Sequence, residues 1–216
     1  MPGVETQTLD SRSTDSFLDR YSEAQRYFKG QGSLNVALKQ LAADLKNHGI
    51  DYAVIGAVAL FAHGYKRFTE DINLLLTADG LEKFRKELLG RGGWGFGGYD
   101  QTESATCVRS FPLGIMIEVM TTGEYPGDGK PKPVSMPEPS TASIEIDGIK
   151  IVTLEKLIEL KLASGMTAPH RLKDLADVQE LIKIRTLEKD FAERLDPYVR
   201  GKFLGLFESV EKSRIS

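Results

Sequence analysis

Oxygen-bearing side chains interrupt two short apolar segments of this sequence. In an extended strand over 71–77, DINLLLT, alternate residues share a face, so Asp71 and Asn73 point away from the apolar side chains. In 114–120, Glu118 stands in the middle of IMIEVM, where an apolar residue would be expected. If the two strands are neighbours, the three side chains converge, and carboxylate and amide oxygens are ligands that Mg²⁺ accepts. The pattern predicts a magnesium site at Asp71, Asn73 and Glu118.

A glycine turn precedes these strands. Residues 51–56, DYAVIG, have the pattern of a short buried strand, and AVALFAHG then has the composition of a helix that ends at Gly64. The turn at Gly56 and Ala57 would place backbone amides at a helix N-terminus, where they can bind phosphate oxygens. Gly56 is equally explained by close packing of strand against helix, and both interpretations stay open.

The remaining elements frame this centre. Leucines at helical spacing predict a helix over 33–48. The segment 121–140 contains five prolines and is expected to be a long irregular excursion. From Thr153 the pattern is helical, with breaks near 165–169 and at 196–197. Further expectations are a helix over 79–89 with Asp79 as N-cap, a glycine-rich loop at 90–99, a hairpin of strands 104–111 and 114–120, and a hairpin in SIEIDGIKIV that turns at Asp147 and Gly148.

This order of elements predicts an α/β fold of the α+β type, with a mixed β-sheet flanked by helices and a helical C-terminal region. The expected organisation is a mobile tail at 1–14, a domain at 15–152 and a helical region at 153–216 packed on it.

Composition excludes several classes of protein. The balance of 28 basic and 31 acidic residues gives a formal charge of −3, so no overall field draws the chain to nucleic acid or to anionic lipid. The single cysteine, Cys107, cannot form an internal disulfide, which favours a reducing compartment and a cytoplasmic location. The longest apolar stretch, AVIGAVALFA, is too short to span a bilayer, and no secretory signal is visible. His63 and His170 have no neighbours at metal-ligand spacing and are expected at or near the surface.

The segment VIGAVALFAHGYKRFTEDINLLL resembles the signature of the nucleotidyltransferase superfamily, which includes distant relatives such as polymerase β. In that family a strand ends in a small-residue turn, a helix follows, and the next strand carries Asp-x-Asp. A later strand carries a third carboxylate, which Glu118 matches. The AbiEii-like and minimal nucleotidyltransferase group is the most similar: its Arg-x-Thr-x-Asp lead-in resembles Arg67, Thr69 and Asp71. Its second block, a lysine followed by Lys-Asp-x-x-Asp, resembles Lys161, then Lys173, Asp174 and Asp177.

The resemblance implies a fold, a reaction and a set of roles. The carboxylates would hold two Mg²⁺ ions, which bind a nucleoside triphosphate and activate an acceptor hydroxyl for attack on the α-phosphorus. Asp71, Asn73 and Glu118 would be metal ligands and catalytic, and Lys161 would neutralise developing charge. Nucleotide binding is expected of Gly56, Ala57, Arg67, Thr69, Lys173 and Asp174.

The sequence departs from the family pattern at two positions. Asn73 replaces the second aspartate, which keeps an oxygen donor but removes a negative charge, so metal affinity should fall. The turn reads Gly56-Ala57, where many members have a hydroxyl or a second glycine.

Structural alternatives also stay open for the site residues. Asp71 and Asn73 are also typical of the exposed face of an edge strand. Glu118 is also explained as a solvated residue or as the partner of Arg109. Lys161 could lay its stem on apolar surface with its ammonium in water, and Lys173, Asp174 and Asp177 could form a solvated helix face.

Two functional hypotheses follow. The first is a Mg²⁺-dependent nucleotidyltransferase that moves a nucleoside monophosphate from a triphosphate to a hydroxyl of a small molecule, an RNA end or a protein. The second is a module of the same fold that binds a nucleotide or a partner with little or no turnover, because Asn73 removes a charge. A role in a toxin–antitoxin pair rests on the group resemblance alone. No membrane partner is expected, and a homo-oligomer is compatible with the sequence.

Overall fold

The computed structural model describes residues 16–96 and 107–215. The expected tail at 1–14, the end of the glycine-rich loop and the start of the strand expected at 104–111 lie outside the described residues. Within these ranges, seven strands form one mixed sheet in the order β3-β4-β5-β2-β1-β7-β6. The strands are β1 Tyr52–Ile55, β2 Asp71–Leu76, β3 Trp94–Phe96, β4 Cys107–Ser110, β5 Met116–Thr121, β6 Ser143–Ile146 and β7 Ile149–Val152.

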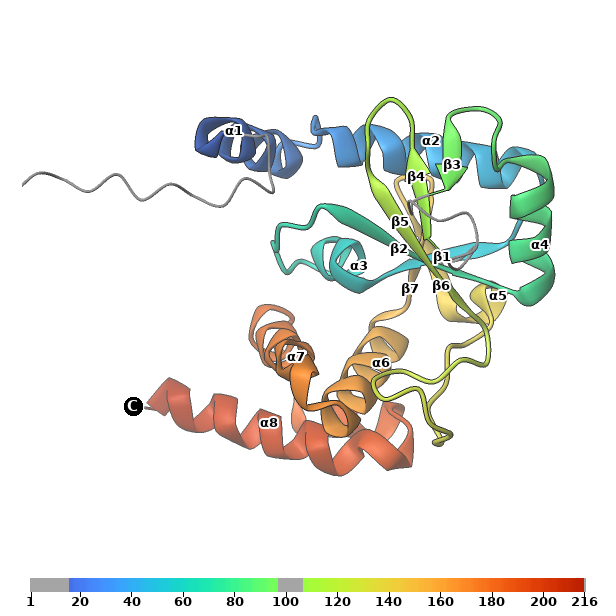
Figure 1. The fold of residues 1–216 in the computed structure, drawn as a ribbon. Coiled ribbons are helices and arrows are strands. Elements are labelled where there is room, and N and C mark those ends of the chain that lie inside the picture. Colours follow the sequence, from blue (N-terminus) through green and yellow to red (C-terminus); the bar gives the residue numbers. More distant parts are fainter. Residues whose placement is uncertain (1–15, 97–106, 216) are drawn as a thin grey trace, which may run out of the picture.

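Helices cover both faces of the sheet (Figure 1). Helices α2 and α4 lie on one side, and α6, α7 and α8 form a group on the other, where α6 contacts α3. The mixed sheet flanked by helices confirms the predicted fold class. The helices are α1 Phe17–Phe28, α2 Ser33–Asn47, α3 Gly56–Ala62, α4 Ala78–Glu87, α5 Pro139–Ala142, α6 Leu154–Thr167, α7 Leu172–Ile184 and α8 Pro197–Ile215, with the 3₁₀ segments η1 Pro169–Arg171 and η2 Lys189–Arg194.

The centre of the sheet explains why the site strands form where they do. Strand β2 lies between β5 and β1, and its residues Ile72, Leu74, Leu75 and Leu76 are fully buried. Burial of this much apolar surface is the main favourable contribution to folding. Because β2 is an internal strand, the interpretation of Asp71 and Asn73 as edge-strand residues is wrong.

Both predicted hairpins are present. Strands β4 and β5 pair antiparallel, as do β6 and β7, which turn through Asp147 and Gly148 with positive φ at both residues. The segment 121–140 is irregular apart from the start of α5. It is anchored to itself by the hydrogen bonds from Gly123 N to Met136 O and from Met136 N to Glu124 O.

Several local expectations were wrong. Thr77, not Asp79, caps α4, because its side chain accepts a hydrogen bond from Gly80 N. His63 is buried, and its Nε2 hydrogen-bonds Val152 O at 2.8 Å. Cys107, the first residue of β4, is half-buried. Helix α1 was not predicted at all; Ser16 begins it with a capping box.

Candidate active site

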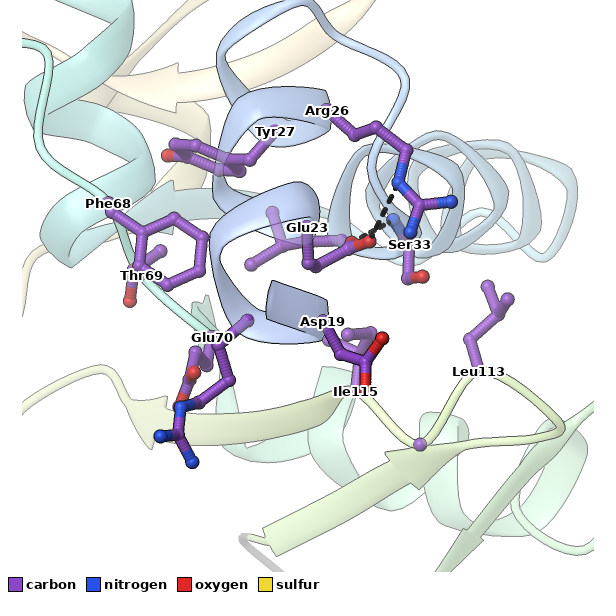
Figure 2. A pocket seen from close by; sticks show the side chains of 13 residues that line it. Asp19, Glu23, Arg26, Tyr27, Ser33, Phe68, Thr69, Glu70, Leu113 and Ile115 are labelled. Carbon is purple, nitrogen blue, oxygen red and sulfur yellow. Dashed lines mark hydrogen bonds and ion pairs between the residues drawn. The ribbon is translucent and has the colours of Figure 1, made fainter. Parts of the chain in front are cut away.

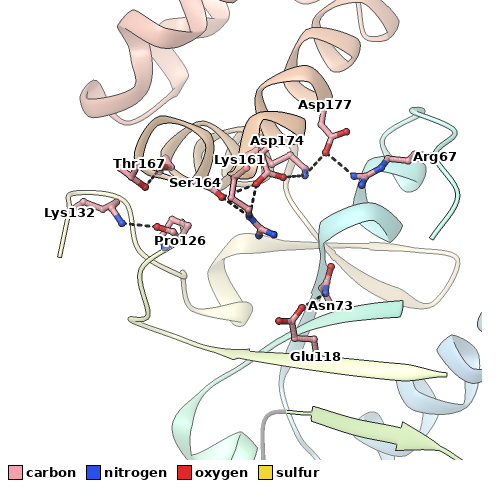
Figure 3. Close-up of polar contacts among 12 residues, drawn as sticks. Arg67, Asn73, Glu118, Pro126, Lys132, Lys161, Ser164, Thr167, Asp174 and Asp177 are labelled. Carbon is pink, nitrogen blue, oxygen red and sulfur yellow. Dashed lines mark hydrogen bonds and ion pairs between the residues drawn. The ribbon is translucent and has the colours of Figure 1, made fainter. Parts of the chain in front are cut away.

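The strand register brings the three predicted donors together. Strands β2 and β5 run parallel, and Asn73 lies directly opposite Glu118. The Nδ2 atom of Asn73 is 3.0 Å from Glu118 Oε2 and 3.3 Å from Asp71 Oδ2. Figure 3 shows Asn73 and Glu118 pointing toward each other from their two strands. In the pairing of β5 with β4, Glu118 lies opposite Cys107, and Arg109 lies opposite Met116. The strand register therefore does not place Glu118 opposite Arg109.

The orientation of Asn73 decides what this group can hold. A carboxylate only accepts hydrogen bonds, so the amide NH₂ of Asn73 faces the two carboxylates and its carbonyl oxygen faces Gly56. Asp71 and Glu118 keep free lone pairs, and these hard oxygen donors suit Mg²⁺. Within the described ranges, no group of three or more His, Cys, Asp or Glu side chains is arranged to hold a metal ion. The donor set therefore fits one cation with water in its shell better than a closely spaced pair.

Gly56 is required by the close approach of Asn73. Its φ is +66°, and a Cβ atom added there would lie 2.0 Å from Asn73 Oδ1. Such a backbone is unfavourable for any residue with a side chain. Gly56 thus lines the site at the start of α3, while Ala57 is buried behind it.

The lead-in to β2 is held at two points. The hydroxyl of Thr69 donates a hydrogen bond to Asp71 Oδ1. Two residues earlier, the guanidinium of Arg67 forms an ion pair with Asp177 on α7 at 2.9 Å. The Arg-x-Thr-x-Asp sequence thereby joins a strand of the sheet to the C-terminal helices.

A buried ionic cluster lies behind the site, between α6 and α7. The ammonium of Lys161 is 2.9 Å from Asp174 Oδ1 and 2.7 Å from Asp177 Oδ2, and all three side chains are at most 8% exposed. Burial alone would raise the pKa of Asp174, but the charge and hydrogen bond of Lys161 and the hydrogen bond of Ser164 hold it below its usual value. Lys161 therefore does not extend into water, and Asp174 and Asp177 are not a solvated face. Lys173 alone of that motif is exposed, and it does not line the cavity described next.

A cavity of about 290 Å³ opens beside Asn73 and Glu118. The sheet forms one wall, α6 and the start of α7 form another, and Glu124–Gly127 of the proline-rich segment closes it. This segment is fixed in place, because the ammonium of the buried Lys132 side chain donates a hydrogen bond to Pro126 O at 2.6 Å (Figure 3). The same ammonium donates to Asp128 Oδ1 at 2.7 Å. The lining residues that sequence analysis missed are Glu124, Tyr125, Pro126, Gly127, Met120, Met136, Ile55, Leu157, Leu160, Ser164 and Arg171.

Two of the missed residues carried a weak signal in the sequence. Ser164 is three residues after Lys161 and shares its helix face, and Arg171 is three residues before Asp174. Ser164 Oγ donates to Asp174 Oδ2 at 2.7 Å, and Arg171 Nε donates to Ser164 Oγ at 3.2 Å. Nothing in the sequence indicated that Tyr125 would approach the sheet.

A second cavity, of about 360 Å³, lies between α1 and the segment that leads into β2 (Figure 2). Helix α1 contributes Asp19, Glu23 and Tyr27, and these face Phe68–Glu70 and the turn at Leu113–Ile115. Thr69 lines this cavity while it hydrogen-bonds Asp71. Burial raises the pKa of Tyr27 to about 12, with Arg67 lowering it and Asp71 raising it. Asp71 lines neither cavity itself, but its hydrogen-bond partners Thr69 and Asn73 line one each.

Among the described residues, no helix is both long and apolar enough to cross a membrane.

Solved structures that are similar to this chain include the following three. ANT(2″)-Ia in complex with adenylyl-2″-tobramycin has a TM-score of 0.52 and 11% identity, over 84% of this chain and 98% of that one. JHP933 from Helicobacter pylori has a TM-score of 0.46 and 15% identity, over 88% and 93% of the two chains. An antigenic nucleotidyltransferase-like protein from Paracoccidioides brasiliensis has a TM-score of 0.44 and 18% identity, over 68% and 74%. At these identities the first likeness shows the fold alone.

No curated protein matches the sequence. A family model does: "Nucleotidyl transferase of unknown function (DUF2204)" matches residues 35–199. That range contains β1 to β7, the three oxygen donors and the buried cluster of α6 and α7. The chain belongs to this nucleotidyl transferase family of unknown function, within the nucleotidyltransferase superfamily.

Proposed function

We propose that the protein transfers a nucleoside monophosphate from a nucleoside triphosphate to a hydroxyl group, with Mg²⁺ held by Asp71 and Glu118. The observation that carries this proposal is the meeting of two carboxylates and Asn73 at the mouth of a cavity walled by α6 and α7. In this proposal, residues 15–152 supply the metal ligands, and residues 153–216 supply the cationic side chains that line the cavity.

The reaction assigns a different substrate to each cavity. The nucleotide occupies the cavity beside Asn73 and Glu118, and the acceptor reaches Asp71 from the cavity beside α1. The acceptor oxygen forms a bond with the α-phosphorus, the bond from that phosphorus to the β-bridging oxygen breaks, and pyrophosphate leaves. The hydroxyl proton passes to Asp71. When bound, Mg²⁺ supplies charge neutralisation for the phosphates.

The chain's own residues prepare this step. Thr69 fixes one oxygen of Asp71, so the other remains directed toward Asn73. Asn73 holds Asp71 and Glu118 at a fixed separation before any substrate arrives. Such preorganisation lowers the cost of assembling the site in the transition state.

Label transfer tests the proposal. The full chain is incubated with Mg²⁺, a cell extract or small hydroxyl compounds, and each of ATP, CTP, GTP and UTP labelled at the α-phosphate. Small hydroxyl compounds are included because the ANT(2″)-Ia structure contains adenylyl-2″-tobramycin. We expect covalent labelling that Asp71→Asn and Glu118→Gln reduce at least a hundredfold. Labelling by both variants at the wild-type level would refute nucleotidyl transfer at this site.

A second candidate function is nucleotide binding without turnover. It is favoured by one observation: the NH₂ of Asn73 occupies the space between the two carboxylates. In that case a triphosphate with Mg²⁺ would raise the melting temperature of the protein, but no labelled product would form. A ligand at a hundred times its Kd stabilises by about 2.7 kcal/mol, which a melting curve resolves.

A further inference from the structure

We infer that Arg171 is the residue that binds the β- and γ-phosphates of the nucleotide, and that Ser164, Asp174 and Lys161 position it. This inference rests on the proposed function, because it names how the nucleotide cavity selects a triphosphate.

The cationic side chains among the described residues that line this cavity are Lys161 and Arg171. Lys161 is unsuited to a ligand, because its side chain is 8% exposed and its ammonium is already within 2.9 Å of two carboxylates. The Arg171 side chain is 40% exposed. Of the two, Arg171 is the one that an anion in the cavity can reach.

The contacts of Arg171 leave its binding face free. Its Nε donates to Ser164 Oγ at 3.2 Å and lies 3.2 Å from Asp174 Oδ2. A guanidinium has five N–H donors, and Nε accounts for one. Among the described residues, the two terminal amino groups of Arg171 donate no hydrogen bond, so four donors remain.

Ser164 and Asp174 set the direction of that face. The single proton of the Ser164 hydroxyl goes to Asp174 Oδ2, so the Ser164 oxygen is left to accept from Arg171 Nε. The other oxygen of Asp174 accepts from Lys161. Lys161 thus fixes Asp174, and Asp174 together with Ser164 fixes the guanidinium.

The position of Arg171 matches a triphosphate. It lines the same cavity as Asn73 and Glu118 but comes from the opposite wall, just before α7. A phosphate chain that spans the cavity would meet the proposed cation site at one end and the planar guanidinium at the other. Two parallel N–H groups suit the oxygens of one phosphate or of two neighbouring ones, and they would stabilise the departing pyrophosphate.

The test measures binding by isothermal titration to the full chain in Mg²⁺. The probes are ATP, CTP, GTP and UTP, the corresponding monophosphates, and inorganic tripolyphosphate. The variants are Arg171→Gln, which removes the charge, Arg171→Lys, which keeps the charge without the fork, and Ser164→Ala, which frees the guanidinium. Arg185→Gln is the matched control, because Arg185 is an exposed arginine at the end of α7 that does not line the cavity.

We expect Arg171→Gln to weaken triphosphate and tripolyphosphate binding about 10- to 100-fold, the effect of losing charge-assisted hydrogen bonds. Monophosphate binding should change less than about threefold by the same reasoning, since Arg171 lies beyond the α-phosphate. Arg171→Lys and Ser164→Ala should fall between Arg171→Gln and the wild type, and Arg185→Gln should match the wild type. A purely structural role would weaken both classes of nucleotide together, so equal losses for triphosphates and monophosphates overturn the inference.

Different results would refute the proposed function and the role of Arg171. If the wild-type chain binds no triphosphate, the proposed function fails. If the wild type binds a triphosphate and Arg171→Gln and Arg171→Lys bind it equally well, the role of Arg171 is refuted while the proposed function stands. Should Arg171→Gln melt at a much lower temperature than the wild type, the comparison of triphosphate with monophosphate binding in Arg171→Lys decides the matter.

Discussion

Asn73 and Glu118 face each other from the parallel strands β2 and β5, with 3.0 Å between the Asn73 amide nitrogen and a Glu118 carboxylate oxygen. The same nitrogen reaches Asp71 at 3.3 Å. One amide nitrogen therefore lies within hydrogen-bonding distance of both carboxylates that would hold the cation.

Replacing this amide by a carboxylate should exchange hydrogen bonding for cation binding. Without divalent cations, Asn73→Asp loses two hydrogen bonds and adds a like charge, which should cost about 1–2 kcal/mol of stability. With Mg²⁺, its melting temperature should rise more than that of the wild type. Asn73→Ala is the control, since it loses the amide and gains no charge. Equal Mg²⁺-induced shifts in Asn73→Asp and Asn73→Ala would show that no cation binds at this position.

Replacing Lys161 should lower the free energy of unfolding, independently of any direct effect on activity. Lys161→Met leaves Asp174 and Asp177 buried without their shared partner, and breaking a buried ion pair costs about 3–5 kcal/mol. Lys173→Met, on the exposed face of α7, should change stability by less than about 0.5 kcal/mol. Urea unfolding measures both. If Lys161→Met unfolds at the wild-type urea concentration but loses label transfer, Lys161 acts on the substrate directly.

Alanine variants at Gly56 and Gly148 distinguish the stability cost of backbone strain from the cost of a steric clash. Both have positive φ, +66° and +78°, but a Cβ atom would meet Asn73 only at Gly56, whereas Gly148 has nothing within 4 Å. Gly148→Ala should therefore cost about 1–2 kcal/mol, from backbone strain alone. Gly56→Ala should cost more and should weaken triphosphate binding, because Asn73 must move. Equal melting temperatures for the two variants would contradict the close approach of Gly56 and Asn73.

His63 should make stability depend on pH. Burial lowers its pKa below 6.5, against the raising effect of its hydrogen bond to Val152 O. The unfolded chain then binds more protons than the folded one as the pH falls below 6.5, so the contribution of His63 is present above 6.5 and is lost below it. The loss can reach about 1.4 kcal/mol per pH unit. Urea unfolding at pH 7.5 and 5.5 should show a smaller loss for His63→Gln than for the wild type; parallel losses would exclude His63 as the cause.

The cavity beside α1 should affect the acceptor and not the nucleotide. Leu113→Arg places a bulky charge in that cavity, and it should reduce label transfer at least tenfold while triphosphate affinity stays at the wild-type value. Ile144→Arg, at an exposed residue of β6, is the matched control and should leave both unchanged. Unimpaired transfer by Leu113→Arg would mean that the acceptor approaches from elsewhere.

The sequence by itself predicted the strands other than β3, which lies in the segment expected to be a glycine-rich loop at 90–99, and it predicted the members of the central group. Alternation in DINLLLT places Asp71 and Asn73 on one face, because successive side chains of a strand point in opposite directions. Turn residues such as Asp147-Gly148 fixed the hairpins for equally local reasons. The predicted convergence of Asp71, Asn73 and Glu118 required that their two strands be neighbours. In the structure, β2 and β5 pair in parallel.

Only the tertiary structure decided the environment of the cationic side chains Lys161 and Arg171. Helical periodicity placed Lys161, Asp174 and Asp177 on helices but could not say whether water or another helix covers them. Packing of α6 on α7 buries all three, so the charge of Lys161 is paired with Asp174 and Asp177. Arg171 is left as the exposed cationic side chain that lines the cavity. Burial and long-range pairing depend on which segments distant in the chain come together, and no local pattern carries that information.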